Sequence, residues 1–131
     1  MSAQARITNP AVRNIIAGLI EQRVAATCIT TDLEAGYSGR DSREVTAIAA
    51  RRKADYVVLA ITEAIAERAR DVQRRMAARG EHRAAGVIDL LTAAVAEHYG
   101  AVIVHYDADF ENIAATTGQP HTWIVPRGSV N

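Results

Sequence analysis

AVIVHYDADFENIAATTG, residues 101–118, is the stretch of the chain that decides its fold. Its first six residues are nearly all apolar, which is typical of a central strand in a parallel sheet. Asp109 is a good helix N-cap, and Gly118 is a good helix terminator, so a helix is expected between them. A buried strand that leads directly into a helix predicts an α/β protein.

The same alternation extends outward in both directions. Asn9 followed by Pro10 indicates an N-cap and first helical residue, and the segment from Thr31 to Glu34 matches a capping box. Strands separated by helices predict a mainly parallel sheet with helices on both faces, in a three-layer α/β/α arrangement. Strands are expected at 24–29, 56–61, 101–106 and 122–125, and helices from 10, from 31, at 42–53, at 62–80, at 87–99 and at 109–118.

The composition suits one soluble domain, residues 1–131. Hydrophobic residues make up 49% of the 131 positions, which is enough for a core, and the formal net charge is zero. A zero net charge provides no overall field toward nucleic acid or membranes, although a local patch can still bind RNA. No stretch has membrane-spanning length, and the first residues lack the apolar region of a signal peptide. A cytoplasmic location is therefore expected, and the single cysteine, Cys28, fits a reducing compartment.

Four acidic residues are predicted to lie at helix starts: Glu34, Asp89, Asp107 and Asp109. Asp107 and Asp109 also follow a strand, and in an α/β fold such junctions gather at one edge of the sheet. Carboxylates that meet there repel one another unless a cation lies between them, and oxygen ligands suit Mg²⁺ or Mn²⁺.

Each of these acids also has a structural interpretation. Glu34 occupies the reciprocal position of the capping box, and Asp109 is an N-cap. Asp89 lies in a first helical turn, where the helix dipole favours an anion, and Asp107 suits a turn. The functional interpretation is favoured for the group because Asp107 and Asp109 end the most apolar strand, where charge is costly unless it is paired or binds a metal.

Other chemistries find less support. The four histidines lack zinc-ligand spacing, although His105 beside Asp107 could shuttle protons; a packed histidine at a strand end is the favoured interpretation. There is no phosphate-binding glycine loop and no nucleophile elbow. Residues 40–53 and 67–83 each carry a net charge of +3. These two segments indicate either solvated helix faces with intrahelical ion pairs or a surface that binds a polyanion. The solvated helix face is the favoured interpretation for most of these residues.

Three stretches carry a family resemblance: CITTDLEAGYSGR (28–40), VIDLLTAAVAEHYG (87–100) and VIVHYDADFENIAATTGQPHTWIVPRGS (102–129). On these residues the chain resembles the PIN-domain ribonucleases, and most closely the VapC toxins of bacterial toxin–antitoxin pairs. The resemblance runs in register from Ser2 to the C-terminus.

The resemblance implies that the four carboxylates are catalytic and bind Mg²⁺ or Mn²⁺. It implies an endoribonuclease toxin that cleaves structured RNA, of the tRNA or rRNA type, and so stops translation. The implied partners are a cognate VapB-type antitoxin, which blocks the site, and a second copy in a homodimer. Ser2 is implied to contact a water or phosphate near the metal.

The chain departs from the family pattern at its start. Family members begin with a strand that ends in an aspartate, and a Ser-Ala pair follows shortly after it. Here Ser2 and Ala3 match that pair directly after Met1, so the sequence is expected to lack the N-terminal strand and its aspartate, either because its start is placed too far downstream or because it is a truncated form. An alternative function is therefore a catalytically impaired, truncated PIN module that binds an antitoxin, and a third is a phosphatase or nucleotide-binding protein, disfavoured by the absent glycine loop.

Overall fold

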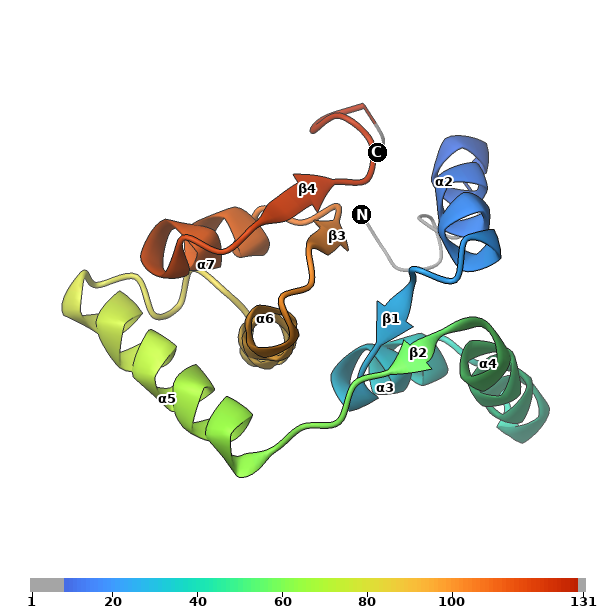
Figure 1. Ribbon diagram of the computed structural model, residues 1–131, viewed down its shortest axis with the longest axis horizontal. Coiled ribbons are helices and arrows are strands. Elements are labelled where there is room, and N and C mark those ends of the chain that lie inside the picture. Colours follow the sequence, from blue (N-terminus) through green and yellow to red (C-terminus); the bar gives the residue numbers. More distant parts are fainter. Residues whose placement is uncertain (1–8, 130–131) are drawn as a thin grey trace. The chain divides into compact units, whose positions relative to one another are not determined.

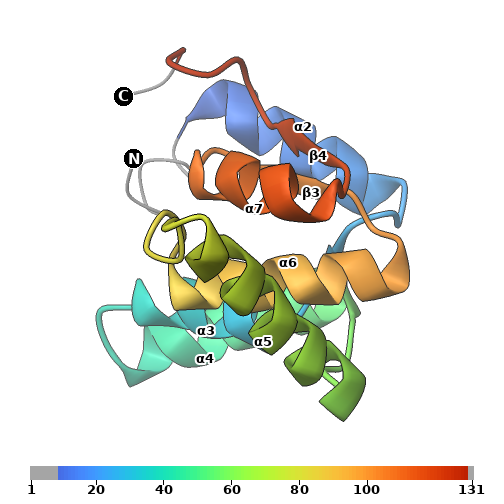
Figure 2. The same cartoon turned by 90° about the vertical axis from the view of Figure 1, so that its left-hand side faces the viewer.

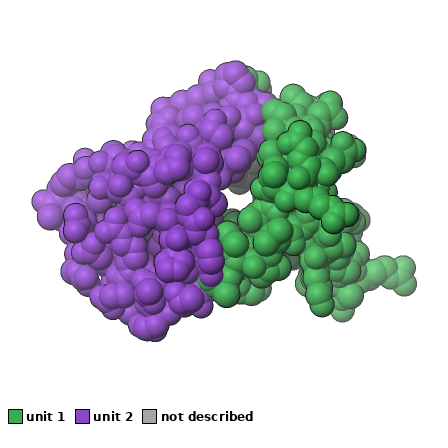
Figure 3. Space-filling model, viewed as in Figure 1, with its two compact units in different colours: residues 1–60, 128–131 green, residues 61–127 purple. Residues whose placement is uncertain are grey.

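The computed structural model describes residues 9–129 and divides the chain into two compact units. The first comprises residues 1–60 with 128–131, and the second comprises residues 61–127 (Figure 3). Two predictions concern the start of the chain, namely the missing N-terminal strand and the role of Ser2. Both lie outside the described residues. Each unit is an α/β structure built on two parallel strands.

The first unit contains three helices and two short strands among its described residues (Figure 1). The strands pair in parallel, Ala26 with Val57 and Thr27 with Val58, and helices α3 and α4 pack against each other. In chain order, the elements are α2 (Pro10–Glu21), β1 (Ala26–Thr27), α3 (Ile29–Tyr37), α4 (Ser42–Asp55) and β2 (Val57–Val58).

An arginine ties the helices of the first unit to its first strand. Nε of Arg52 on α4 donates to Oδ1 of Asp32 on α3 at 2.8 Å, and its Nη2 donates to Oγ1 of Thr27 on β1 at 2.8 Å. The guanidinium also lies 4.8 Å from the ring centroid of Tyr56. Two hydrogen bonds from one planar fork fix the positions of both partners, a geometry that lysine does not reproduce.

The second unit places two parallel strands beside three helices (Figures 1 and 2). Residues 103–105 pair in register with residues 121–123, and the three helices pack against one another pairwise. The elements are α5 (Glu63–Ala78), α6 (Val87–Tyr99), β3 (Ile103–His105), α7 (Asp109–Thr117) and β4 (His121–Trp123).

A buried apolar cluster holds the second unit together. Each helix contributes side chains at helical spacing, and β3 contributes Ile103. The cluster consists of Val72, Met76, Leu90, Ala93, Ala96, Ile103, Phe110 and Ile113. Because Phe110 belongs to the first turn of α7 and Leu90 to the first turn of α6, this packing also fixes where those two helices begin.

Several predicted boundaries are confirmed. Asn9 caps α2 by accepting a hydrogen bond from the Val12 N–H, and Thr62 caps α5 in the same way through Ile65. Gly100 and Gly118 end α6 and α7 with φ values of 67° and 71°, a conformation that favours glycine.

Other predicted boundaries are wrong in detail. The strand expected at 24–29 covers Ala26–Thr27 only, because α3 begins at Ile29 and not near Thr31. Thr31 is the third residue of α3, where its hydroxyl accepts from the Cys28 N–H and completes the capping box. Glu34 is therefore an exposed mid-helix residue and has no capping role. Strands β2 and β3 also cover only part of their predicted ranges, and β4 begins one residue before its predicted range, at His121, and ends at Trp123.

None of the helices within residues 9–129 combines the length and apolar character needed to cross a membrane.

Candidate metal centre

The turn between β3 and α7 positions two of the predicted carboxylates. Strand β3 ends at His105, whose Nδ1 accepts a 3.1 Å hydrogen bond from the Asp107 N–H. Oδ1 of Asp107 then accepts from the Asp109 N–H at 2.9 Å. Asp107 therefore acts as the turn residue that its type favours, with its side chain bonded to the backbone two residues further on.

Asp109 does not have the N-cap role that the sequence predicts. It is the first residue of α7, and Ala108 occupies the cap position without a side-chain hydrogen bond. Oδ2 of Asp109 instead accepts a 2.9 Å hydrogen bond from the backbone N–H of Gly86. Gly86 is the N-cap of α6, so this bond joins the starts of two helices that lie far apart in the sequence.

Asp89 lies in the first turn of α6, as predicted. Asp89, Asp107 and Asp109 each offer one carboxylate oxygen such that all three oxygens lie within 4.8 Å of one another. All three residues are half-buried. The structure thus brings together three of the four predicted site residues.

Negative charge accumulates at this cluster. Two unit charges 4.8 Å apart repel by about 1 kcal/mol in water and by roughly 3 kcal/mol at an effective dielectric constant near 20. Within residues 9–129, neither Asp107 nor Asp109 has an arginine or lysine at ion-pairing distance. A divalent cation would offset this repulsion, since oxygen-only donor sets suit Mg²⁺ and Mn²⁺.

The space beside Gly86 fits such an ion. A Cβ atom added at Gly86 would lie 3.7 Å from Oδ2 of Asp89 and 3.7 Å from Oδ2 of Asp109. The glycine therefore leaves open the volume that faces both carboxylates. Its N–H also contributes a fixed hydrogen bond to one of them, so the residues present fit a divalent metal.

Glu34 lies in the other unit, on α3, with an exposed side chain. Its participation in the site stays a prediction.

A pair of histidines supports the cluster from the strand side. Nε2 of His105 lies 2.9 Å from Nδ1 of His121. His105 is only 6% exposed. Burial, and secondarily the neighbouring His121, lowers the pKa of His105 to about 4, so its ring is neutral near pH 7.

The sequence predicts the packed strand-end position of His105 but gives neither this pairing nor the role of Gly86. The register of β3 against β4 brings the two histidines close. His121 lies opposite Ile103, and His105 is two residues further along β3, opposite Trp123. Gly86 has no equivalent signal beyond its position directly before a predicted helix.

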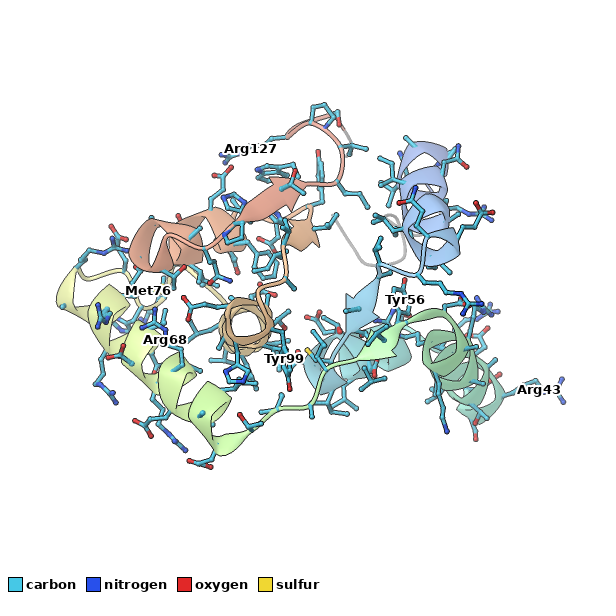
Figure 4. The ribbon with its side chains drawn as sticks, in the orientation of Figure 1. Arg43, Tyr56, Arg68, Met76, Tyr99 and Arg127 are labelled. Atoms are coloured by element: carbon cyan, nitrogen blue, oxygen red, sulfur yellow. The ribbon has the colours of Figure 1, made fainter. Side chains whose placement is uncertain are left out.

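Carboxylates neutralise most of the arginines on α5, so the interpretation of 67–83 as a surface that binds a polyanion is not supported. Arg68, labelled in Figure 4, donates to Glu97 at 2.6 Å and to Asp71 at 2.9 Å. The hydrogen bond that Arg68 donates to Glu97 is the largest cause of the raised pKa of Arg68. Further ion pairs join Arg70 to Glu63 and Glu67, Arg74 and Arg75 to Asp71, and Arg79 to Glu81.

Parallel strands flanked by helices, with a cluster of acids where β3 leads into α7, define an α/β protein with a candidate divalent-metal site. The PIN domain family model matches residues 6–116 and so spans both units, and the chain belongs to the PIN-domain family.

Within that family the chain is of the VapC ribonuclease type. It is 42% identical over 126 residues to Ribonuclease VapC51 of Mycobacterium tuberculosis (strain ATCC 25618 / H37Rv), covering 96% of this chain and 90% of that protein. It is 38% identical over 128 residues to Ribonuclease VapC21 of the same strain, covering 98% and 93%. Ribonuclease VapC2 of Mycobacterium tuberculosis (strain CDC 1551 / Oshkosh) is 37% identical over 123 residues, covering 90% and 84%.

Proposed function

We propose that this protein is a metal-dependent endoribonuclease toxin that cleaves structured RNA, of the tRNA or rRNA type, and thereby stops translation. The observation that carries the proposal is the group of three carboxylate oxygens within 4.8 Å of one another, at the starts of α6 and α7. Similarity to VapC ribonucleases over most of the chain supports the reaction class.

Asp89, Asp107 and Asp109 would hold Mg²⁺ or Mn²⁺, with Glu34 proposed as a fourth carboxylate of the catalytic site. When bound, the metal would lower the pKa of a water molecule and stabilise charge on the phosphate. Asp107 and Asp109 each use one oxygen in a backbone hydrogen bond, which fixes the orientation of the second oxygen. Glu34 is proposed to orient or deprotonate the attacking water.

Basic residues of α4 are proposed to bind the RNA backbone. Arg43 extends outward from this helix in Figure 4. Within the described residues, neither Arg43 nor Lys53 has a carboxylate at ion-pairing distance. These charges therefore remain available to phosphates, unlike most of those on α5.

A VapB-type antitoxin is the proposed protein partner. The first unit contains a mostly apolar cavity of about 450 Å³, with Ile16 and Ile20 on α2 and Ile48 on α4 among its lining residues. Arg13, Arg51 and Asp55 also line it, as does Arg52, which is already paired with Asp32. Such a surface fits an apolar segment that carries acidic side chains.

A homodimer is also proposed. Ile29, Leu33 and Tyr37 recur every four residues on α3 and are 51%, 65% and 93% exposed. This apolar stripe fits a second copy of the chain. If Leu33→Asp left the sedimentation coefficient of a dimeric protein unchanged, α3 would not be the interface.

Residues 1–131 are proposed to form one PIN-like domain that acts in the cytoplasm, where its RNA substrates are found. The family match across both units supports the single domain.

The function is tested by incubating the full chain with a mixture of folded tRNA and rRNA fragments. Cleavage is expected with Mg²⁺ or Mn²⁺ and not with EDTA, and it should fall at least about 100-fold in Asp89→Asn, which removes a charged ligand. Glu81→Gln is the matched control, because Glu81 pairs with Arg79 outside the cluster and its loss should leave cleavage unchanged.

Two results would refute the proposal: cleavage that persists in EDTA, or an equal rate for Asp89→Asn and the wild-type protein. Tight binding of a VapB-type peptide without any cleavage would instead favour a binding module.

A further inference from the structure

His105 is held in one orientation by the groups around it. Its ring centroid lies 5.0 Å from that of Phe110, 4.9 Å from that of Trp123 and 5.1 Å from that of His121. It is buried at the end of β3, and both of its ring nitrogens have hydrogen-bond partners. A buried ring with two fixed polar contacts has little freedom to rotate.

These contacts determine which ring nitrogen of His105 carries its proton. A backbone N–H can only donate, so Nδ1 of His105, which lies 3.1 Å from the Asp107 nitrogen, must be an unprotonated acceptor. The proton of neutral His105 is therefore on Nε2, which donates to Nδ1 of His121 at 2.9 Å. The Asp107 N–H thus fixes the tautomer of His105, and His121 accepts the hydrogen bond from its remaining ring N–H.

A continuous series of hydrogen bonds runs from this pair to the candidate metal ligands. His105 accepts from the Asp107 N–H, and the Asp107 carboxylate accepts from the Asp109 N–H. The Asp109 carboxylate accepts from the N–H of Gly86, three residues before Asp89. Hydrogen bonds thus link His105 through the backbone N–H groups of Asp107 and Asp109 to the carboxylate of Asp107.

We propose that His105, held by His121, is a positioning residue that orients Asp107 and Asp109 for divalent-metal binding. This role rests on the proposed metal site and names the residues that hold its ligands in place. In metal proteins, groups that hold the ligands in place commonly change metal affinity when they are removed. The role requires only an acceptor at the position of Nδ1, and this requirement makes it testable.

Asparagine at position 105 can supply that acceptor. Its side-chain oxygen can accept a hydrogen bond from the backbone N–H two residues further on, that of Asp107. Asp107 already forms a turn of this type with the N–H of Asp109. Glutamine carries the same amide one methylene further out and cannot close this turn. His105→Asn and His105→Gln therefore form a matched pair with the same chemistry and a different reach, and His105→Leu removes the acceptor altogether.

The experiment measures Mn²⁺ binding to the metal-free full chain by electron paramagnetic resonance, with thermal unfolding of each variant as a check on folding. His105→Leu and His105→Gln are expected to raise the dissociation constant for Mn²⁺ about 10- to 100-fold. His105→Asn should remain within about threefold of the wild-type value. His121→Leu should lie between these limits, because it removes only the hydrogen bond from Nε2 of His105.

The outcomes separate this inference from the proposed function. If the wild-type protein does not bind Mn²⁺, the metal site itself is wrong. If the wild-type protein binds Mn²⁺ and His105→Leu binds equally well, the site stands and the positioning role is overturned. Equal weakening in His105→Asn and His105→Gln also overturns it, and this pair decides the question if His105→Leu does not fold.

Discussion

The backbone N–H of Gly86 lies 2.9 Å from Oδ2 of Asp109 and donates a hydrogen bond to it, joining the start of α6 to the start of α7. A helix N-terminus has N–H groups without intrahelical partners, and here one of them binds the carboxylate of another helix. The bond also brings Asp89 and Asp109 to the same open space. Local backbone chemistry, and not only core packing, therefore assembles the acidic cluster.

Gly86→Ala is expected to weaken metal binding without unfolding the protein. Alanine tolerates the φ of −67° at this position, but its methyl group would lie 3.7 Å from both Asp89 and Asp109 oxygens. Mg²⁺ keeps several waters when bound, and the methyl group would crowd them. Titration calorimetry with Mg²⁺ should show an affinity about tenfold lower.

Gly18→Ala provides the control for that substitution. Gly18 lies in α2, and an added Cβ meets no atom within 4 Å. This change should stabilise the helix by about 0.5–1 kcal/mol and leave metal affinity unchanged. If both variants bound Mg²⁺ as well as the wild-type protein, the space beside Gly86 would not be part of the metal site.

Asp107→Asn should stabilise the metal-free protein. Asparagine keeps the side-chain oxygen that accepts from the Asp109 N–H, while one charge is removed from the cluster. Relief of repulsion is expected to raise the free energy of unfolding in EDTA by about 1 kcal/mol. Added Mn²⁺ should then stabilise the wild-type protein more than the variant, as measured by urea unfolding. A variant less stable than the wild-type protein in EDTA would contradict the electrostatic account.

Arg52→Lys should destabilise the protein by about 1–3 kcal/mol, because the ammonium group cannot keep the bonds to both Asp32 and Thr27. Arg40→Lys is the control: Arg40 pairs with Glu44, and its side chain is 84% exposed, so almost no change in stability is expected. Chemical denaturation of both variants measures the difference. Similar values would show that the Arg52 network contributes little.

Ile113→Ala should cost about 2–5 kcal/mol, because Ile113 is 1% exposed in the core of the second unit. Val104→Ala, at a position that is 42% exposed, should cost much less. Thermal unfolding compares the two. If the core change were as mild as the surface change, the packing of α7 would be looser than described.

Acid should remove the contribution of Asp71. Desolvation raises its pKa, but Arg75 and Arg68 together lower it further, so the net pKa lies below the ordinary 3.8. Since the folded-state pKa is depressed, the stabilisation is present above pH 3.8 and is lost as the pH falls through the lower folded-state value. Asp71→Asn should therefore be less stable than the wild-type protein near neutral pH, and the difference should shrink in acid. A difference that stayed constant with pH would contradict this assignment.

The sequence predicts much of the element order because its signals are local. Asn9, Thr62 and Gly100 act at the helix ends where their chemistry indicates. Thr31 and Asp109 were predicted to be N-caps and are not. Each side chain can make hydrogen bonds from more than one helical position, so residue type alone does not identify the cap. Thr31 fills the third helical position instead of the cap, and Asp109 bonds to a residue far away in sequence.

The candidate site was predictable in outline and not in its supporting contacts. Asp107 and Asp109 could be placed together because they follow a strand, and strand-to-helix junctions share one edge of a sheet. Asp89 could be grouped with them as an acid at a predicted helix start. The bonds from Gly86 to Asp109 and from His105 to His121 depend on long-range packing and on strand register, and neither leaves a local pattern in the sequence.

Trp123 is the only tryptophan in the chain, and it lies in the layer that supports the carboxylates. Its indole N–H donates to Glu111 at 2.8 Å, Arg127 lies over its ring, and its centroid is 4.9 Å from that of His105. Its intrinsic fluorescence is consequently a natural optical reporter of the second unit. Emission excited at the red edge of the absorption band would follow the environment of the acidic site during a titration, with no label attached.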